Sequence, residues 1–492
     1  MFLQSASSLL HEHYISVIGA LILVVSVSQA YYQLYINPLG KYPGPKLAAA
    51  SRLPQLYHTF RGDLLEWVNG LHSTHGDVVR IAPDELSYAT GEAWKGIYGH
   101  ASGGKKVTEK DPRFYGPSFN GAPDIIRGNG PDHSRFRRNF SHAFSDRALR
   151  EQQSLICGYA DALIDKLHRI IKEDPEAKVN MVRMFNLTTF DIMGDLTFGD
   201  SLNLLAGTGN LAWVSAIFMT IQTNSIRRLA RYVPWTAPII QRLIPKELKQ
   251  QSVAHYKASQ ESVDKRLDDN RTLHKPDIWG IVMNQKEDLR ISRTEMYANS
   301  QVFMVAGTET TATALSGLLY HLLMTPDKMN ILVEEVRGAF EKDSDIEMRA
   351  LEHMPYLSAC ISEGLRVYPL FQLACLASLL MRGCLFVTVL SVHHWATYRN
   401  TRNFRLPNQF IPERWIGDEF ATDNKSAFQP FSFGPRNCIG KNLAYHELRL
   451  ILAKVLYNFD ITLLPESVGW EKQKTFLLWE KHDLMVQLKA RQ

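Results

Sequence analysis

One predicted helix is long enough to decide the plan of the whole fold. Ser292 to Glu295 (SRTE) has the pattern of a capping box, which satisfies the first free amides of a helix. The apolar run that follows continues without proline as far as Thr325, directly before Pro326. Its length of about thirty residues is far above the roughly ten to fourteen of an average helix. We therefore expect this helix to cross the centre of the protein.

The rest of the sequence indicates a mainly α fold with a minor β part. Helical periodicity dominates from Ser134 to about Gln492, whereas Pro54 to about Tyr98 combines a helical pattern with a short β-type stretch. Hydrophobic residues make up 45% and charged residues 21% of the chain, so one large core is feasible. The net charge of +5 is small, and no dense basic run interleaves with aromatics. Nucleic acid is therefore not an expected partner.

An uncharged apolar segment near the N-terminus predicts a membrane anchor. Tyr14 to Ile36 contains about the twenty apolar residues that span a hydrocarbon core. A cleaved signal peptide is the alternative, but His11, Glu12 and His13 precede the segment in place of a basic region. No lysine or arginine precedes the segment, whereas several follow it. The positive-inside rule therefore leaves the body in the cytosol and predicts contact with membrane lipid.

These features divide the chain into a lumenal N-terminus, a transmembrane helix, a proline-rich elbow and one catalytic domain, with bounds 1–13, 14–36, 37–54 and 55–492. In the elbow, we expect Pro38, Pro43 and Pro45 to exclude helix. A stiff elbow of this kind would hold the body at a fixed angle to the membrane.

The five cysteines are too few and too scattered for a disulfide framework in a chain of this length. They are Cys157, Cys360, Cys375, Cys384 and Cys438. No C-x-x-C pair occurs, so a structural zinc site is not expected. We expect most of these thiols to be small buried apolar groups, with Cys438 as the exception.

Cys438 lies in the segment FSFGPRNCIG, directly before a predicted helix. A cysteine at a helix N-terminus has a lowered pKa, and the helix amides point toward its sulfur, as a thiolate ligand requires. Gly434 and Gly440 allow the backbone to approach a large flat cofactor. Phe431 can shield one side of the sulfur, and Arg436 supplies a cation that suits a cofactor carboxylate. For an arbitrary cysteine, a plain loop position would be the simpler interpretation.

The same segment fits the pattern F-x-x-G-x-R-x-C-x-G and resembles the haem-binding signature of the cytochrome P450 family. The resemblance implies a P450 fold and haem b as cofactor, with the Cys438 thiolate as axial ligand of the iron. It implies that Phe431 and Arg436 contact the haem. It also implies a monooxygenase of the endoplasmic reticulum membrane that receives electrons from NADPH through a cytochrome P450 reductase.

The centre of the long helix carries a second motif, Ala306 to Thr310 (AGTET). Threonines inside helices usually just bond to the preceding turn. Here the motif resembles the oxygen-binding groove of the family, in which Gly307 makes room beside the haem. Glu309 and Thr310 are then the predicted catalytic residues, because a carboxylate and a hydroxyl can guide protons to bound dioxygen.

Two further motifs are assigned by the same resemblance. Glu363 and Arg366 lie one helical turn apart and resemble, together with Arg414, a buried charged triad of the family that locks the cysteine loop. On their own, two such charges would be a solvated surface pair. His133 and Arg137 resemble the pair that binds the haem propionates, although other arginines lie close by in the sequence.

Residues 370–386 depart from the family pattern. A proline-rich turn, a propionate-binding arginine and strands with glycine turns are expected there, but the chain reads LFQLACLASLLMRGCLF. Leu370 to Ser378 can be encoded as CTG TTC CAA CTG GCC TGC CTC GCG TCx. Reading from the third base gives Val-Pro-Thr-Gly-Leu-Pro-Arg-Val, which resembles the missing family segment. We therefore expect a frameshift or a misplaced intron boundary at this position.

The segments NPLGKYPGPKLAAASRLP and SHAFSDRALREQ resemble the fungal microsomal P450 group that includes isotrichodermin and averantin hydroxylases. This implies a hydrophobic small-molecule substrate, such as a terpenoid or polyketide of secondary metabolism. We expect the stretch from Asn203 to Ile244 to shape an apolar pocket for it. Two alternatives stay open: a haem-deficient remnant, and a haem-thiolate isomerase or dehydratase without a redox partner. The presence of both Glu309 and Thr310 favours the monooxygenase.

Overall fold

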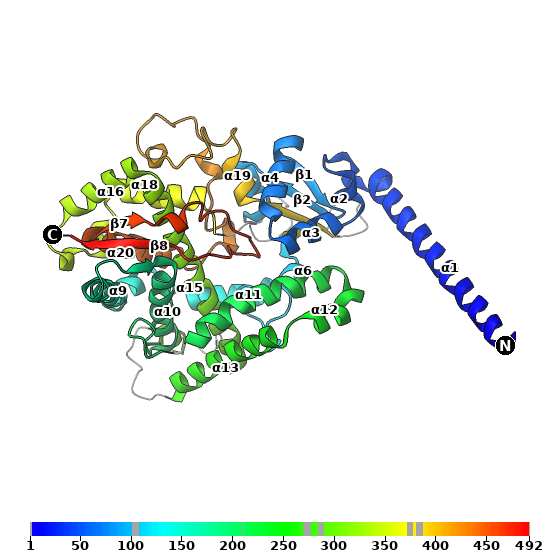
Figure 1. Cartoon of the computed structure of the whole chain (residues 1–492), viewed down its shortest axis with the longest axis horizontal. Coiled ribbons are helices and arrows are strands. Elements are labelled where there is room, and N and C mark those ends of the chain that lie inside the picture. The colour runs from blue at the N-terminus through cyan, green and yellow to red at the C-terminus, as the bar shows by residue number, and fades with distance from the viewer. Residues whose placement is uncertain are drawn as a thin grey trace.

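The computed structural model describes residues 2–100, 108–209, 211–268, 277–283, 290–370, 377–379 and 387–491. Helices dominate this part of the chain (Figure 1). Their bounds are α1 Phe2–Tyr31, α2 Lys46–Ala50, α3 Leu53–Arg61, α4 Leu64–His75, α5 Gly91–Tyr98, α6 Pro112–Tyr115, α7 Gly130–Ser141, α8 Asp146–Glu151, α9 Gln153–Glu173 and α10 Met181–Phe198. They continue with α11 Leu211–Tyr232, α12 Ala237–Leu243, α13 Lys246–Asp268, α14 Ile278–Met283, α15 Arg293–Met324, α16 Pro326–Ala339, α17 Met348–Leu351, α18 Pro355–Val367, α19 His394–Arg399 and α20 Lys441–Asn458.

The strands form two small sheets. Their bounds are β1 Val78–Ala82, β2 Glu85–Tyr88, β3 Glu109–Lys110, β4 Lys178–Asn180, β5 Ala377–Leu379, β6 Thr388–Val392, β7 Phe459–Leu463 and β8 Met485–Ala490. One sheet has the order β1-β2-β6-β5-β3, and the other has the order β4-β8-β7. In the larger sheet β2 and β6 are parallel, with Leu86 opposite Leu390, and the other pairs are antiparallel. The mainly α fold with a minor β part is confirmed.

Helix α15 is the centre of the body, as the sequence predicts. The capping box is present: the Ser292 amide donates to Glu295 Oε2 at 2.8 Å, and the Glu295 amide donates to Ser292 Oγ at 3.4 Å. The helix ends at Met324, with Thr325 as its C-cap. Helices α10, α13, α18 and α20 pack around it, so apolar and small residues are buried on all its sides.

The N-terminal helix projects away from the body at the end where α2 and α3 lie, opposite the C-terminus (Figure 1). Ser16–Ile36 is long and apolar enough to cross a membrane, and its side chains are almost all exposed. Arg293–Met324 is also long and apolar enough to cross a membrane, but it is mostly buried inside the body. The first segment is therefore the predicted anchor, and the second is the core helix described above.

The C-terminal end of the anchor is held to the larger sheet through Arg80 on β1. The buried Arg80 guanidinium donates to the Gln33 carbonyl at 2.8 Å and to Gln33 Oε1 at 2.9 Å. Asn37 donates to the same Gln33 Oε1 at 2.6 Å. The expectation that prolines exclude helix in the elbow is wrong in detail, because Pro38 begins a 3-10 turn and Pro45 directly precedes α2. Proline at a helix start lacks only an amide that would be free anyway.

Candidate functional site

The loop from Phe431 to Gly440 holds Cys438 in a tight backbone arrangement directly before α20. The Cys438 amide donates to the Phe431 carbonyl at 2.9 Å, which closes the loop. Gly434 has φ of +75°, and a Cβ at this position would overlap the carbonyl oxygen of Tyr98. Only glycine fits there without strain. On the other side of the cysteine, a Cβ on Gly440 would lie 4.0 Å from the Cys438 sulfur.

The Cys438 thiol differs from the other cysteines in the described part of the chain. Cys438 is exposed, whereas Cys360 is fully buried and Cys157 is half-buried. Burial raises the pKa of both the Cys360 and the Cys157 thiol, which keeps them protonated and unreactive. Cys375 and Cys384 lie outside the described residues. Cys438 is therefore the described thiol that is placed to bind a ligand.

A group of basic side chains surrounds the cysteine loop. Arg137 on α7 donates to the Asn437 carbonyl at 2.5 Å and to Asn437 Oδ1 at 2.6 Å, one residue before the cysteine. Arg436 donates to the Gly128 carbonyl at 2.9 Å and to Asn129 Oδ1 at 3.1 Å. These contacts fix both guanidinium groups beside the loop.

The pKa of His133 on α7 shows that this region is positively charged. Burial and the nearby cations Arg436, Lys110 and Arg137 together lower the pKa of His133 to about 4. The imidazole is therefore neutral at pH 7 and surrounded by positive charge. Such a region suits the carboxylates of a cofactor, as the propionate assignment of His133, Arg137 and Arg436 requires.

Glu309, one of the predicted catalytic residues, is part of a buried ion pair in the structure. Its Oε1 lies 2.8 Å from Nζ of Lys481, and the side chains are 1% and 2% exposed. Lys481 also donates to Thr313 Oγ1 at 2.7 Å. Burial raises the pKa of Glu309, and the Lys481 ammonium opposes this effect. Glu309 Oε2 has no hydrogen-bond partner among the described residues, so this oxygen is available for a proton.

Thr310 and Gly307 lie on the same stretch of α15. The Thr310 hydroxyl donates to the Ala306 carbonyl at 2.6 Å, which is the ordinary bond of a threonine to the preceding helical turn. A Cβ on Gly307 would overlap the sulfur of Met193 on α10. In the structure, Gly307 therefore allows α15 to approach α10 closely. Its predicted place beside the cofactor stays a prediction.

The structure brings Glu363, Arg366 and Arg414 together as a fully buried cluster. Arg366 makes two bonds to the Glu363 carboxylate, at 2.7 and 2.8 Å, and Arg414 Nε donates to it at 3.1 Å. Trp415 donates its indole N–H to the same carboxylate at 3.0 Å, and Arg414 also pairs with Asp423. The three predicted side chains are 0% exposed, so they form a structural unit and not a surface pair.

This cluster is connected to the cysteine loop through Tyr398 and Gln429. Arg366 donates to the Tyr398 carbonyl at 3.1 Å. The Tyr398 hydroxyl accepts from the Gln429 amide at 3.0 Å, two residues before Phe431. The position of the loop is therefore coupled to the charged cluster by a chain of buried hydrogen bonds.

A second buried carboxyl links α15 to the helix after the cysteine. Burial raises the pKa of Glu447 on α20 to about 8, and a hydrogen bond with Thr311 on α15 opposes the rise. Glu447 is 1% exposed, and its Oε1 has no partner among the described residues. Neither Glu447 nor Lys481 was singled out from the sequence, because their burial depends on residues more than a hundred positions away.

The donor set fits a haem held by a single thiolate. An exposed cysteine precedes a helix, glycine lies on both sides of it, and His133, Arg137 and Arg436 make the surroundings positive. Among the described residues, no group of three or more His, Cys, Asp or Glu side chains forms a metal site, so the remaining iron ligands would come from the porphyrin. The fold and the site therefore define a haem-thiolate protein.

Comparison with known proteins agrees with this class. The sequence model of the Cytochrome P450 family matches residues 43–488, so the chain belongs to the cytochrome P450 family. It is 45% identical over 471 residues to the cytochrome P450 monooxygenase efuB of Hormonema carpetanum, with 93% of each chain covered. It is 39% identical to astJ of Aspergillus oryzae, with 94% of each chain covered. It is also 39% identical to FUM2 of Gibberella moniliformis, over 94% of this chain and 100% of FUM2. The chain is a fungal-type haem-thiolate monooxygenase.

Proposed function

We propose that this monooxygenase inserts one atom of dioxygen into an apolar small molecule of fungal secondary metabolism, such as a terpenoid or polyketide. The observation that carries the proposal is the exposed Cys438 thiol in a glycine-cradled loop directly before α20. The relatives efuB, astJ and FUM2 are fungal monooxygenases, which supports the reaction type. When bound, the haem supplies the activation of dioxygen.

The residues around the loop have distinct roles in this proposal. Cys438 would hold the haem iron through its sulfur, and the helix dipole of α20 favours the thiolate form that this requires. Phe431 lies against Tyr445 on α20, with ring centroids 5.1 Å apart, and excludes water from one side of the sulfur. His133, Arg137 and Arg436 would hold the two propionates by hydrogen bonds and charge.

Glu309 and Thr310 move protons in this scheme. The unbonded Oε2 of Glu309 takes up and releases a proton during turnover, because burial raises the pKa of this carboxyl. Lys481 keeps the carboxyl in one orientation through the bond to Oε1. The Thr310 hydroxyl, which donates to the Ala306 carbonyl, has its lone pairs left to accept a hydrogen bond from water.

The proposed location is the endoplasmic reticulum membrane, with the body in the cytosol. The exposed apolar helix Ser16–Ile36 supports an anchor, and the basic residues that follow it support the orientation. Lys441 and the partly exposed Arg449 lie on α20 near the cysteine loop and suit an acidic face of an NADPH-dependent reductase. Alkaline carbonate should leave the full chain in membranes, and release into the supernatant would contradict the anchor.

Isotope labelling tests the reaction itself. The full chain is reconstituted with NADPH-cytochrome P450 reductase and a panel of terpenoids and polyketides under ¹⁸O₂. We expect a product with one ¹⁸O atom, formed only with NADPH. A rearranged or dehydrated product that forms without NADPH and without ¹⁸O would contradict the monooxygenase and favour the isomerase or dehydratase alternative.

A further inference from the structure

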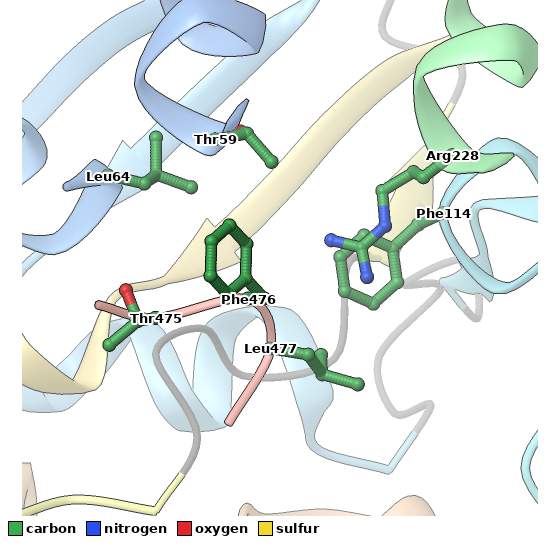
Figure 2. Close-up of a pocket in the computed structure, with 7 residues that line it drawn as sticks. All are labelled: Thr59, Leu64, Phe114, Arg228, Thr475, Phe476 and Leu477. Carbon is green, nitrogen blue, oxygen red and sulfur yellow. The ribbon is translucent and has the colours of Figure 1, made fainter. Parts of the chain in front are cut away.

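A small pocket lies between four parts of the chain that are far apart in the sequence (Figure 2). They are the α3 and α4 region, α6, α11 and the loop after residue 473. The side chains that line the pocket are Thr59, Leu64, Phe114, Arg228, Thr475, Phe476 and Leu477. All are apolar or uncharged except Arg228, which belongs to the stretch that we expected to shape the substrate pocket. One cation in an apolar pocket requires an explanation.

The Arg228 guanidinium has an unusual environment. Its central carbon lies 3.9 Å from the ring centroid of Phe114, so it is stacked on an aromatic face. Its Nε is buried and has no hydrogen-bond partner among the described residues. Burial lowers the pKa of Arg228, which reflects the loss of water around the charge. Figure 2 shows its terminal nitrogens pointing across the hollow toward Phe476.

Glu85, the acidic side chain whose charge acts on Arg228, is bound to Arg52 through one of its oxygens. Glu85 Oε2 lies 2.5 Å from Arg52, whereas its buried Oε1 has no hydrogen-bond partner among the described residues. Asp84 pairs with both Arg52 and Arg113. The negative charge of Glu85 raises the pKa of Arg228, although no hydrogen bond joins the two side chains in the described part of the chain. Among the described residues, Arg228 therefore forms no bond to a carboxylate, whereas Arg52 and Arg113 do.

The next arginine on the same face of α11 shows the contrast. Arg231 donates to the Arg113 carbonyl at 2.7 Å and to the Phe114 carbonyl at 3.0 Å, so its role is to hold α6 against α11. Within the described part of the chain, no such bond to a backbone carbonyl restrains Arg228. A guanidinium offers a planar pair of N–H donors that matches a carboxylate in a two-bond arrangement.

We propose that Arg228 binds a carboxylate of the substrate, while the apolar part of the substrate lies along Phe114, Phe476 and Leu477. The substrate is then an amphipathic carboxylic acid and not a neutral hydrocarbon skeleton. This inference rests on the proposed function, because it assigns the polar end of the substrate of that monooxygenase. An apolar wall strengthens the selection, since a charge pair in a site with little water is stronger than in solution.

Decanoate and decanamide test this inference, because they share one skeleton and nearly one size but differ in charge. Binding of each to the full chain in the same detergent is measured by isothermal titration calorimetry. We expect the wild type to bind decanoate at least about tenfold more tightly than decanamide. Arg228→Gln should bind both probes equally, whereas Arg228→Lys, which keeps the charge but not the planar fork, should keep part of the preference.

The matched control is Arg227→Gln, which removes the same charge from the neighbouring position of α11. Arg227 is not among the residues that line the pocket, so this variant should keep the full preference for decanoate. Three results would overturn the inference: no preference in the wild type, a preference that survives in Arg228→Gln, or an equal loss in both glutamine variants. The carbon monoxide spectrum of each variant is recorded separately. If that spectrum lacks the thiolate band while the Arg228-dependent preference remains, the proposed function fails, and only the binding of a carboxylate by Arg228 stands.

Discussion

Among single residues, Lys481 changes the interpretation of Glu309 most. The sequence motif presents Glu309 as an acid beside a cavity, but the structure binds one of its oxygens to a buried ammonium at 2.8 Å. A buried pair of this kind fixes geometry more than it adds stability, because two charges have lost their water. The oxygen that can carry a proton is then Oε2 of Glu309. Lys481 fixes the orientation of this oxygen by binding Oε1.

Removing Lys481 should therefore destabilise the protein more than removing both partners. Lys481→Met leaves the Glu309 carboxyl buried without its cation and should lower the free energy of unfolding by about 3 kcal/mol. The double variant Lys481→Met with Glu309→Gln should regain much of this loss, because no unpaired charge remains. Chemical denaturation followed by circular dichroism measures both. Equal stability of the wild type and Lys481→Met would show that the pair is not formed.

Glu447 predicts a pH dependence with a defined sign. Its pKa is about 8 in the folded protein, whereas an unfolded glutamate titrates near pH 4.3. Between these values the folded state holds a proton that the unfolded chain has released, so stability falls as pH rises. Glu447→Gln should lack this fall and should exceed the wild type above pH 8, by up to about 5 kcal/mol.

Denaturation curves at several pH values between 5 and 9 check this prediction. Glu352→Gln, at an exposed position of the chain, is the matched control and should leave the pH dependence unchanged. If the free energies of unfolding of Glu447→Gln and the wild type change in parallel with pH across this range, Glu447 is not a buried neutral carboxyl.

Among the elements, the charged cluster joins α18 to the 3-10 turn Pro412–Trp415. We expect it to contribute a large part of the stability of the region that holds the cysteine loop. Glu363→Gln keeps the shape but leaves Arg366 and Arg414 buried without a shared carboxylate, at a cost of about 3 to 5 kcal/mol. Glu466→Gln removes a carboxylate from the exposed pair with Lys178 and should cost less than about 1 kcal/mol. Thermal unfolding of both variants gives the comparison, and a similar small effect for both would contradict the structural role of the cluster.

Some elements were predictable from the sequence because their signals are local. The capping box and Pro326 mark both ends of α15, and a continuous apolar run marks the anchor. Likewise, the loop before α20 carries its own pattern of glycine, arginine and cysteine. These parts are specified by neighbours in the chain, so no tertiary information was needed.

Other features depend on contacts between distant segments and were not predictable. The parallel pairing of β2 with β6 joins segments about 300 residues apart, and β5 completes the sheet by pairing with β3. The partner of Glu309 is Lys481 in the C-terminal segment, which stands between Glu480 and His482, so nothing in its local sequence indicates burial. The charge environment of Arg228 also arises only in the folded state.

For the whole molecule, residues 370–386 decide whether the described protein is the one that the cell makes. Leu370 and the backbone of β5 belong to the described residues, whereas 371–376 and 380–386 lie outside them. The frameshift or misplaced intron boundary proposed from the sequence is therefore still a prediction. Sequencing the transcript tests it: we expect a natural frame that encodes Val-Pro-Thr-Gly-Leu-Pro-Arg-Val after Pro369. A transcript that encodes LFQLACLAS without an extra base would refute it.

The central claim concerns the whole protein with its cofactor: one thiolate, from Cys438, binds the haem iron. The reduced full chain should show a strongly red-shifted Soret band with carbon monoxide, because a thiolate ligand donates electron density to the iron. Cys438→Ala should lose this band, while Cys157→Ala, at a half-buried cysteine outside the loop, should keep it. A red-shifted band that survives in Cys438→Ala would contradict the account.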